Sequence, residues 1–168
     1  MRRWLNNSKF IFGDWWRATF HASSSILEQI DNCQKHFLEE LGETEATAFL
    51  NFNFAPPSLR RAIGILGFLH KRILNQCHPV VREVLPRAVD IDANYHTKAL
   101  DPHSALVRYN DRLFNRSLYG YILMYNNLPQ ELVNATSVQA FQSRLTHLAK
   151  QRASIDAANW RESFRFAQ

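Results

Sequence analysis

Cysteine and long apolar runs are both scarce in this chain of 168 residues. The two cysteines, Cys33 and Cys77, are too few for a disulfide framework, which is typical of a protein in a reducing compartment. No apolar run approaches the roughly eighteen residues that span a bilayer. The opening residues, MRRWLNNSKFIFGDWW, contain neither the apolar core nor the cleavage site of a signal peptide. We therefore expect a cytoplasmic or nuclear protein without a membrane segment.

The common motifs of catalysis and cofactor binding are also missing. No P-loop, dinucleotide-binding, HExxH or GxSxG pattern occurs. The spacing of Cys33 with His36, and of Cys77 with His78, is not that of a zinc site, so buried thiols and surface histidines are the simpler interpretation. The acidic pairs most similar to catalytic partners are Asp90 with Asp92 and Asp101 with Asp111, which we interpret as solvated loop carboxylates. We expect no enzyme activity, no metal and no cofactor.

Apolar residues make up 46% of the chain and aromatic residues 12%, enough for a globular core. Their spacing predicts a mainly α fold, an irregular helical bundle of about five or six helices. A long irregular connection is expected at residues 78–111, where prolines interrupt the pattern and only residues 105–109 are compatible with a short strand. We expect residues 22–168 to form a single helical thumb-like domain. Residues 1–21 are an aromatic-rich segment that we interpret as a remnant of a larger architecture.

The clearest helix signal follows Pro56 and Pro57. Ser58 is the expected N-cap, with a helix start near Leu59. Seven apolar residues then fall on one face at helical spacing, as a core-facing helix requires: Leu59, Ala62, Ile63, Leu66, Leu69, Ile73 and Leu74.

Two features of this helix have alternative interpretations. Gly64 and Gly67 lie on one side, where either a neighbouring helix or a nucleic-acid strand could come close. His70 points into the apolar stripe, which is typical of a core histidine whose ring nitrogens are satisfied.

The other helices are predicted from caps and spacing. The first covers residues 26–41, between a Ser25–Glu28 capping box and Gly42, and the second covers residues 45–50 after Thr44. A third covers residues 118–125 and ends at Asn126, and a short turn follows Pro129. The last is a long helix capped by Thr136 or Ser137. The apolar stripe of the first consists of Ile26, Leu27, Ile30, Cys33, Phe37, Leu38 and Leu41, and that of the last of Val138, Phe141, Leu145 and Leu148.

The net charge of +5 is unevenly distributed. Residues 1–49 contain five Lys/Arg against seven Asp/Glu, whereas residues 50–168 contain fifteen against eight. An excess of cations on the C-terminal two-thirds suits a polyanionic partner.

Four segments in this order resemble the C-terminal part of reverse transcriptases encoded by non-LTR (LINE-type) retrotransposons. They are residues 26–42, 55–74, 116–133 and 137–153. The first resembles the helix that follows the polymerase palm. The last two resemble the family's C-terminal end at Tyr125, Asn126, Leu128, Pro129, Ser137, Val138, Phe141, Arg144 and Leu145.

The resemblance implies a thumb and post-thumb fragment that clamps an RNA or RNA–DNA duplex through phosphate contacts. The candidate contacts are Arg60, Arg61, Lys71, Arg72, Arg116, Arg144, Lys150 and Arg152. The catalytic signature of the family, an aromatic residue, a variable residue and two aspartates, does not occur, because Arg112 follows Asp111 in the closest stretch. Two-metal phosphoryl transfer needs such carboxylates, so we expect a fragment that is not an enzyme.

A second interpretation needs no nucleic acid. The aromatic N-terminal segment and the missing active site are also typical of a helical protein-interaction or scaffold module, or of a decayed element. Such a chain would expose apolar surface toward a missing palm and fingers or toward a second copy of itself. A polymerase or nuclease acting alone is the third alternative.

Overall fold

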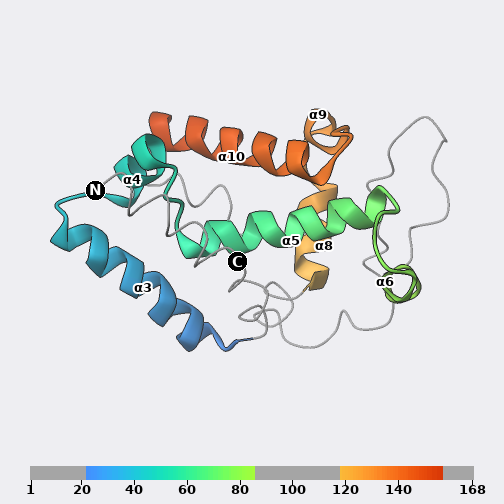
Figure 1. The fold of residues 1–168 in the computed structure, drawn as a ribbon, viewed down its shortest axis with the longest axis horizontal. Coiled ribbons are helices and arrows are strands. Elements are labelled where there is room, and N and C mark those ends of the chain that lie inside the picture. Colours follow the sequence, from blue (N-terminus) through green and yellow to red (C-terminus); the bar gives the residue numbers. More distant parts are fainter. Residues whose placement is uncertain (1–21, 86–117, 157–168) are drawn as a thin grey trace. The chain divides into compact units, whose positions relative to one another are not determined.

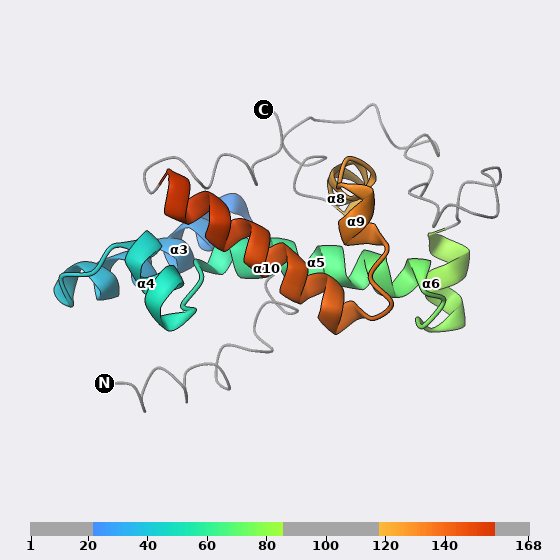
Figure 2. The same ribbon diagram turned by 90° about the horizontal axis from the view of Figure 1, so that it is seen from above.

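The structure, a computed structural model, describes residues 22–85 and 118–156. Within these two stretches the chain forms seven helices and no strand (Figures 1 and 2). The mainly α fold expected from the sequence is therefore confirmed. The helices are α3 (Ser24–Glu40), α4 (Glu45–Phe52), α5 (Pro57–Ile73), α6 (Pro79–Val84), α8 (Leu118–Asn126), α9 (Gln130–Val133) and α10 (Val138–Ile155).

The chain divides into two compact units. The described part of the first comprises residues 22–64 and 148–156, and that of the second comprises residues 65–85 and 118–147. Helix α5 contributes residues 57–64 to the first unit and 65–73 to the second. Helix α10 contributes residues 148–155 to the first and 138–147 to the second. The sequence had predicted one helical domain over residues 22–168.

The N-cap of helix α3 lies two residues before the predicted cap, Ser25. Its N-cap is Ser23, whose side chain accepts a hydrogen bond from the Ile26 amide at 3.5 Å. Ser25, the predicted cap, lies inside the helix and shares a 2.9 Å hydroxyl contact with Ser23. Because the extended backbone of Ser23 allows its hydroxyl to reach the free amides of the first turn, Ser23 and not Ser25 starts the helix.

Gly42 ends α3, as predicted. Its φ of 69° lies in the left-handed region, and its amide donates to the Glu39 carbonyl at 3.0 Å. The Glu43 amide donates to the Leu38 carbonyl at 2.9 Å, which completes a Schellman motif. Two carbonyls at the end of the helix are thereby satisfied.

Thr44 caps α4, which also agrees with the prediction. The Thr44 hydroxyl accepts from the Thr47 amide at 3.1 Å, and the Thr47 hydroxyl accepts from the Thr44 amide at 3.0 Å. This reciprocal pair is a capping box with threonine in the place of the usual glutamate.

The start of α5 differs from the prediction. The helix begins at Pro57, because the Arg60 amide donates to the Pro56 carbonyl at 3.0 Å. Ser58 therefore lies within the first turn and is not the N-cap. Proline is well suited to the first helical position, where its fixed φ fits and its missing N–H has no partner to lose.

The same property of proline explains α6, which lies inside the stretch predicted to be irregular from residue 78. His78 is the N-cap and Pro79 is the first helical residue. The remainder of that stretch lies outside the described residues, together with the possible strand at 105–109, the N-terminal aromatic segment and the C-terminal aromatic pair Trp160 and Phe164.

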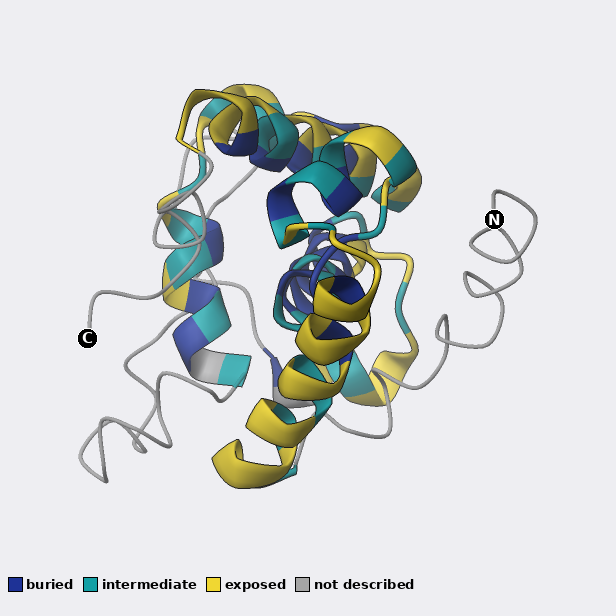
Figure 3. Cartoon of the chain, turned by 90° about the vertical axis from the view of Figure 1, so that its left-hand side faces the viewer, coloured by how far each residue is buried: buried dark blue, intermediate teal, exposed yellow. Residues whose placement is uncertain are grey.

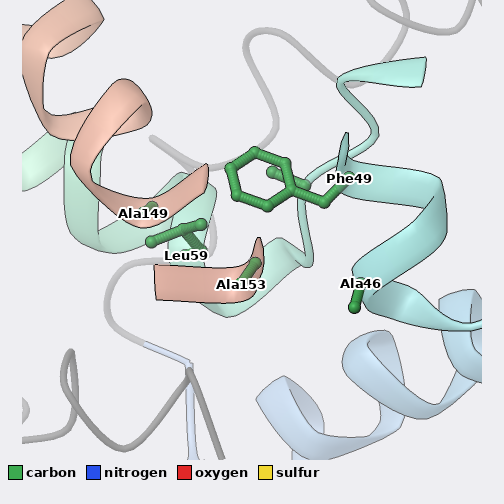
Figure 4. Close-up of a cluster of buried hydrophobic side chains, with 6 residues drawn as sticks. Ala46, Phe49, Leu59, Ala149 and Ala153 are labelled. Carbon is green, nitrogen blue, oxygen red and sulfur yellow. The ribbon is translucent and has the colours of Figure 1, made fainter. Parts of the chain in front are cut away.

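The core of the first unit is built mainly from small side chains. Phe49 is fully buried in a cluster with Leu59 and with alanines of α4 and α10 (Figure 4), to which Ala55 also belongs. The cluster consists of Ala46, Phe49, Ala55, Leu59, Ala149 and Ala153. Leu50 and Ile63 pack against this cluster, and burial of the Phe49 ring contributes roughly 1.5–3 kcal/mol.

The core of the second unit is centred on His70, which is fully buried. Its Nε2 lies 2.8 Å from the Ala135 carbonyl, and its Nδ1 lies 2.8 Å from the Tyr125 hydroxyl. A carbonyl only accepts, so Nε2 carries the hydrogen and Nδ1 of the neutral ring accepts from Tyr125. The Phe141 ring stacks on the imidazole at a centroid distance of 4.2 Å. The predicted core histidine with a satisfied ring is confirmed.

The last predicted boundaries are also confirmed. Asn126 ends α8, and Pro129 is the N-cap of α9. Ser137 caps α10, where its hydroxyl accepts from the Ala140 amide at 3.1 Å. The buried stripe of α10 includes Phe141 and Leu145, as expected.

Replacing Gly42 by alanine tests the helix end. The added Cβ meets no atom within 4 Å, so only the left-handed φ opposes it. We expect G42A to lower the free energy of unfolding by about 1–2 kcal/mol, and G42N by less, because asparagine tolerates this region. Equilibrium urea unfolding measures both, and an alanine variant as stable as the parent would contradict the assigned backbone.

Removing the Tyr125 hydroxyl tests the His70 network. Y125F leaves the buried Nδ1 without its donor and should cost about 1–2 kcal/mol. H70F removes the hydrogen bonds of His70 to both the Tyr125 hydroxyl and the Ala135 carbonyl, so it should cost more than Y125F. Denaturant midpoints of the two variants give the comparison, and the network is refuted if both match the parent chain.

Candidate nucleic-acid interface

The structure divides the eight predicted phosphate contacts into three groups. Three arginines are buried or half-buried and donate hydrogen bonds within their unit. Four cations lie on α5 or α10, three of them exposed and one half-buried, and one cation lies outside the described residues. The hydrogen-bonded arginines are Arg60, Arg61 and Arg72. The four cations on α5 or α10 are Lys71, Arg144, Lys150 and Arg152. The cation outside the described residues is Arg116.

Arg60 and Arg61 attach α3 to α5. One terminal nitrogen of Arg61 donates to both carboxylate oxygens of Asp31, each at 3.0 Å. A terminal nitrogen of Arg60 donates to Gln34 Oε1 at 2.8 Å, and the Gln34 amide nitrogen donates to the Ala55 carbonyl at 3.3 Å. The guanidinium carbon of Arg60 also lies 5.6 Å from the ring centroid of Phe54.

Burial is the main influence on the Arg60 charge. It lowers the pKa of the guanidinium, the neighbouring Arg61 lowers it further, and Asp31 raises it. An arginine in this position is stabilised by partners inside the protein and has little freedom to reach a phosphate.

Arg72 is buried and holds the C-terminal end of α6. Its Nε donates to the Leu85 carbonyl at 2.8 Å, while its terminal nitrogens donate to the Arg82 carbonyl and to Asn75 Oδ1 at 3.4 Å. A cation is favourable at the carbonyl end of a helix. We therefore leave Arg60, Arg61 and Arg72 out of the proposed interface.

Gly67 belongs to a packing contact. A Cβ built on Gly67 would overlap the side chain of Gln142 on α10. Of the two interpretations of the paired glycines, the close approach of a neighbouring helix is therefore the one that describes Gly67.

The outward side of α10 has a distinctive chemistry. No Asp or Glu occurs among its eighteen residues. Arg144 is exposed and donates to the Glu131 carbonyl, and the half-buried Lys150 holds its Nζ 5.5 Å from the ring centroid of Phe49. The exposed polar side chains are Gln139, Ser143, Arg144, His147, Gln151, Arg152 and Ser154. All of them offer hydrogen-bond donors to an anion.

The cations of α10 were predicted as phosphate contacts, but its exposed neutral side chains were not. Gln139, His147 and Gln151 were not among the candidates, although the lack of carboxylates from residue 138 to 155 was visible in the sequence. Lys71, on α5, is exposed and remains a candidate.

Metal ligands do not gather in the described part of the chain. No group of three or more His, Cys, Asp and Glu side chains there is placed to hold a metal ion. His36 lies 3.2 Å from a carboxylate oxygen of Glu39, and the His78 ring accepts from the Val80 amide. Of the helices in residues 22–85 and 118–156, none is long and apolar enough to cross a membrane.

No protein-family model, curated protein or solved structure matches this chain. The resemblance to reverse transcriptase thumbs therefore stays a prediction. The candidate interface depends on the side chains of α10 and their chemistry.

Substitution of Arg61 separates a structural role from phosphate binding. The ion pair with Asp31 is partly shielded, with side-chain exposures of 12% and 24%. A double-mutant cycle with D31N and R61Q should give a coupling of about 1 kcal/mol in urea unfolding. K35Q is the control, since the Lys35–Glu39 pair is solvent-exposed and should contribute about 0–0.5 kcal/mol. A coupling energy of zero would contradict the structural role of Arg61 and would make it a candidate phosphate contact again.

Proposed function

We propose that this chain binds the sugar-phosphate backbone of RNA or of an RNA–DNA duplex and catalyses no reaction. In this proposal it is a thumb-like C-terminal fragment of a non-LTR retrotransposon reverse transcriptase, acting in the cytoplasm or nucleus. The observation that carries the proposal is the composition of α10, which contains Arg144, Lys150 and Arg152 together with amides and hydroxyls and lacks any carboxylate.

The chemistry of α10 suits a phosphate backbone better than bases. Lysine and arginine neutralise phosphates, while glutamine and serine donate to phosphate oxygens without recognising sequence. At about 1.5 Å per residue, Arg144 and Arg152 lie roughly 12 Å apart along the helix axis, a distance over which two or three phosphates could be contacted. Such binding weakens steeply as salt rises, because each neutralised phosphate releases condensed counterions.

The proposal that the chain is not catalytic comes from the sequence. The stretch Tyr109 to Arg112 has one aspartate where the polymerase signature has two. A purified chain that extended a primer in the presence of magnesium would contradict this part of the proposal.

Fluorescence anisotropy with a labelled RNA–DNA duplex tests backbone binding. Titrations at about 50 mM and about 200 mM salt give the slope of log affinity against log salt. We expect R144Q/K150Q to reduce the magnitude of that slope by about two, because two phosphate contacts are lost.

The matched control is K35Q/R82Q, which removes one lysine and one arginine from exposed positions on α3 and α6. Both double variants have the same net charge, so a difference between them reports the position of the cations and not the total charge. The two variants should have equal helical content by circular dichroism. No binding of the parent chain at low salt, or an equal loss in both variants, would rule out α10 as the interface.

A further inference from the structure

Helix α3 exposes a continuous apolar stripe. At 100° per residue, five side chains fall within an arc of about 80°. They are Ile26, Ile30, Cys33, Phe37 and Leu41, and we call them the α3 apolar face. Ile26 is 49% exposed, Phe37 45% and Leu41 38%. Figure 3 shows that most of α3 is exposed.

The helix is attached to its unit by a different side. Leu38 and Gln34 are buried, and Asp31 pairs with Arg61, all about one-quarter of a turn away from the α3 apolar face. Within the face only Phe37 makes a ring contact in the described residues, an edge contact with Phe54 at a centroid distance of 6.4 Å. The side that carries Leu38, Gln34 and Asp31 therefore contributes the buried and ion-paired contacts of α3.

The occupant of this face should be apolar and positively charged. From residue 24 to 41 the helix contains four carboxylates, those of Glu28, Asp31, Glu39 and Glu40, against the single cation of Lys35. A second copy of α3 would bring like charges together. The exposed part of five side chains amounts to a few hundred Å², on the order of half or less of the 800 Å² that each partner of a stable complex buries. A separate protein would need additional surface.

Residues 1–21 meet these requirements. The segment contains six aromatic side chains, among them Trp4, Trp15 and Trp16. Its charged residues are Arg2, Arg3, Lys9, Arg17 and Asp14, so its charge is opposite to that of α3. Only Ala22 and Ser23 separate it from the helix. A tether this short gives an effective concentration in the millimolar range, so a small contact area is sufficient.

We propose that residues 1–21 dock on the α3 apolar face, with their aromatic side chains covering Cys33 and Phe37 and their cations close to the carboxylates of α3. This docking goes beyond nucleic-acid binding and does not depend on it, because it uses no residue of α10.

The reactivity of Cys33 measures the docking in the full-length chain. In a C77S background Cys33 is the only thiol, and its side chain is exposed. A water-soluble disulfide reagent reacts with the accessible thiolate. If residues 1–21 cover the α3 apolar face, the rate of the thiol reaction is reduced by a factor of one plus the docking equilibrium constant. We expect W4S/W15S/W16S to accelerate it about tenfold, which corresponds to about 1.4 kcal/mol of docking free energy.

W160S is the matched control, because it removes the remaining tryptophan from the other end of the chain. It should leave the rate unchanged. All substitutions lie outside the described helices, and circular dichroism verifies that helical content is retained. A triple variant that reacts at the parent rate would overturn the proposal. Protection that rises with protein concentration would assign the face to a second copy and would also overturn it.

Tryptophan fluorescence gives a second measurement, which reports on residues 1–21 directly. In W160F the remaining tryptophans all belong to residues 1–21. Docking predicts that F37D shifts their fluorescence emission to longer wavelength, since the indole rings lose their apolar cover, whereas K35Q does not. An emission maximum in W160F that already equals that of the urea-unfolded chain would contradict docking.

Discussion

The second unit depends on satisfying both nitrogens of one buried imidazole. His70 has no access to water, so each ring nitrogen needs a partner of the correct type, and an unsatisfied buried group costs about 1–3 kcal/mol. The donor comes from Tyr125 on α8 and the acceptor from Ala135 before α10. Phe141 covers the ring from α10 itself. One residue of α5 thus fixes the positions of two helices and a loop, and its ring has no free nitrogen with which to act as an acid, a base or a ligand.

The arginines illustrate the same constraint on charge. A buried cation is stable only when it is paired, so Arg61 requires Asp31 and Arg72 requires the carbonyl of Leu85. These partners are 30 and 13 residues away in the sequence, beyond the range of any helical pattern. A sequence shows that a helix has arginines on its flank, but the long side chain serves equally in an ion pair, against a helix end or in solvent. The sequence therefore identified the cations of the molecule but could not separate structural arginines from available ones.

Features with a local cause were predictable. Gly42, Thr44 and Ser137 act through hydrogen bonds within five residues, and all three positions agree with the prediction. The failures at α5 and α6 share one origin, because Pro57 and Pro79 were treated as interruptions although proline favours the first position of a helix. Ala149 and Ala153 were missed for another reason. Alanine is compatible with core and surface alike, so only the approach of other segments decides that these two are buried.

Helices α3 and α10 differ in the sign of their charged side chains. The carboxylates of α3 repel a polyanion over a screening length of about 8 Å at physiological salt, whereas α10 has no carboxylate with which to do so. Docking of the cationic residues 1–21 on α3 would neutralise part of that repulsion and would use no residue of α10. The acidic N-terminal third and the basic remainder are then compatible with a single polyanionic partner, because the negative charge of α3 is matched within the chain before the partner binds.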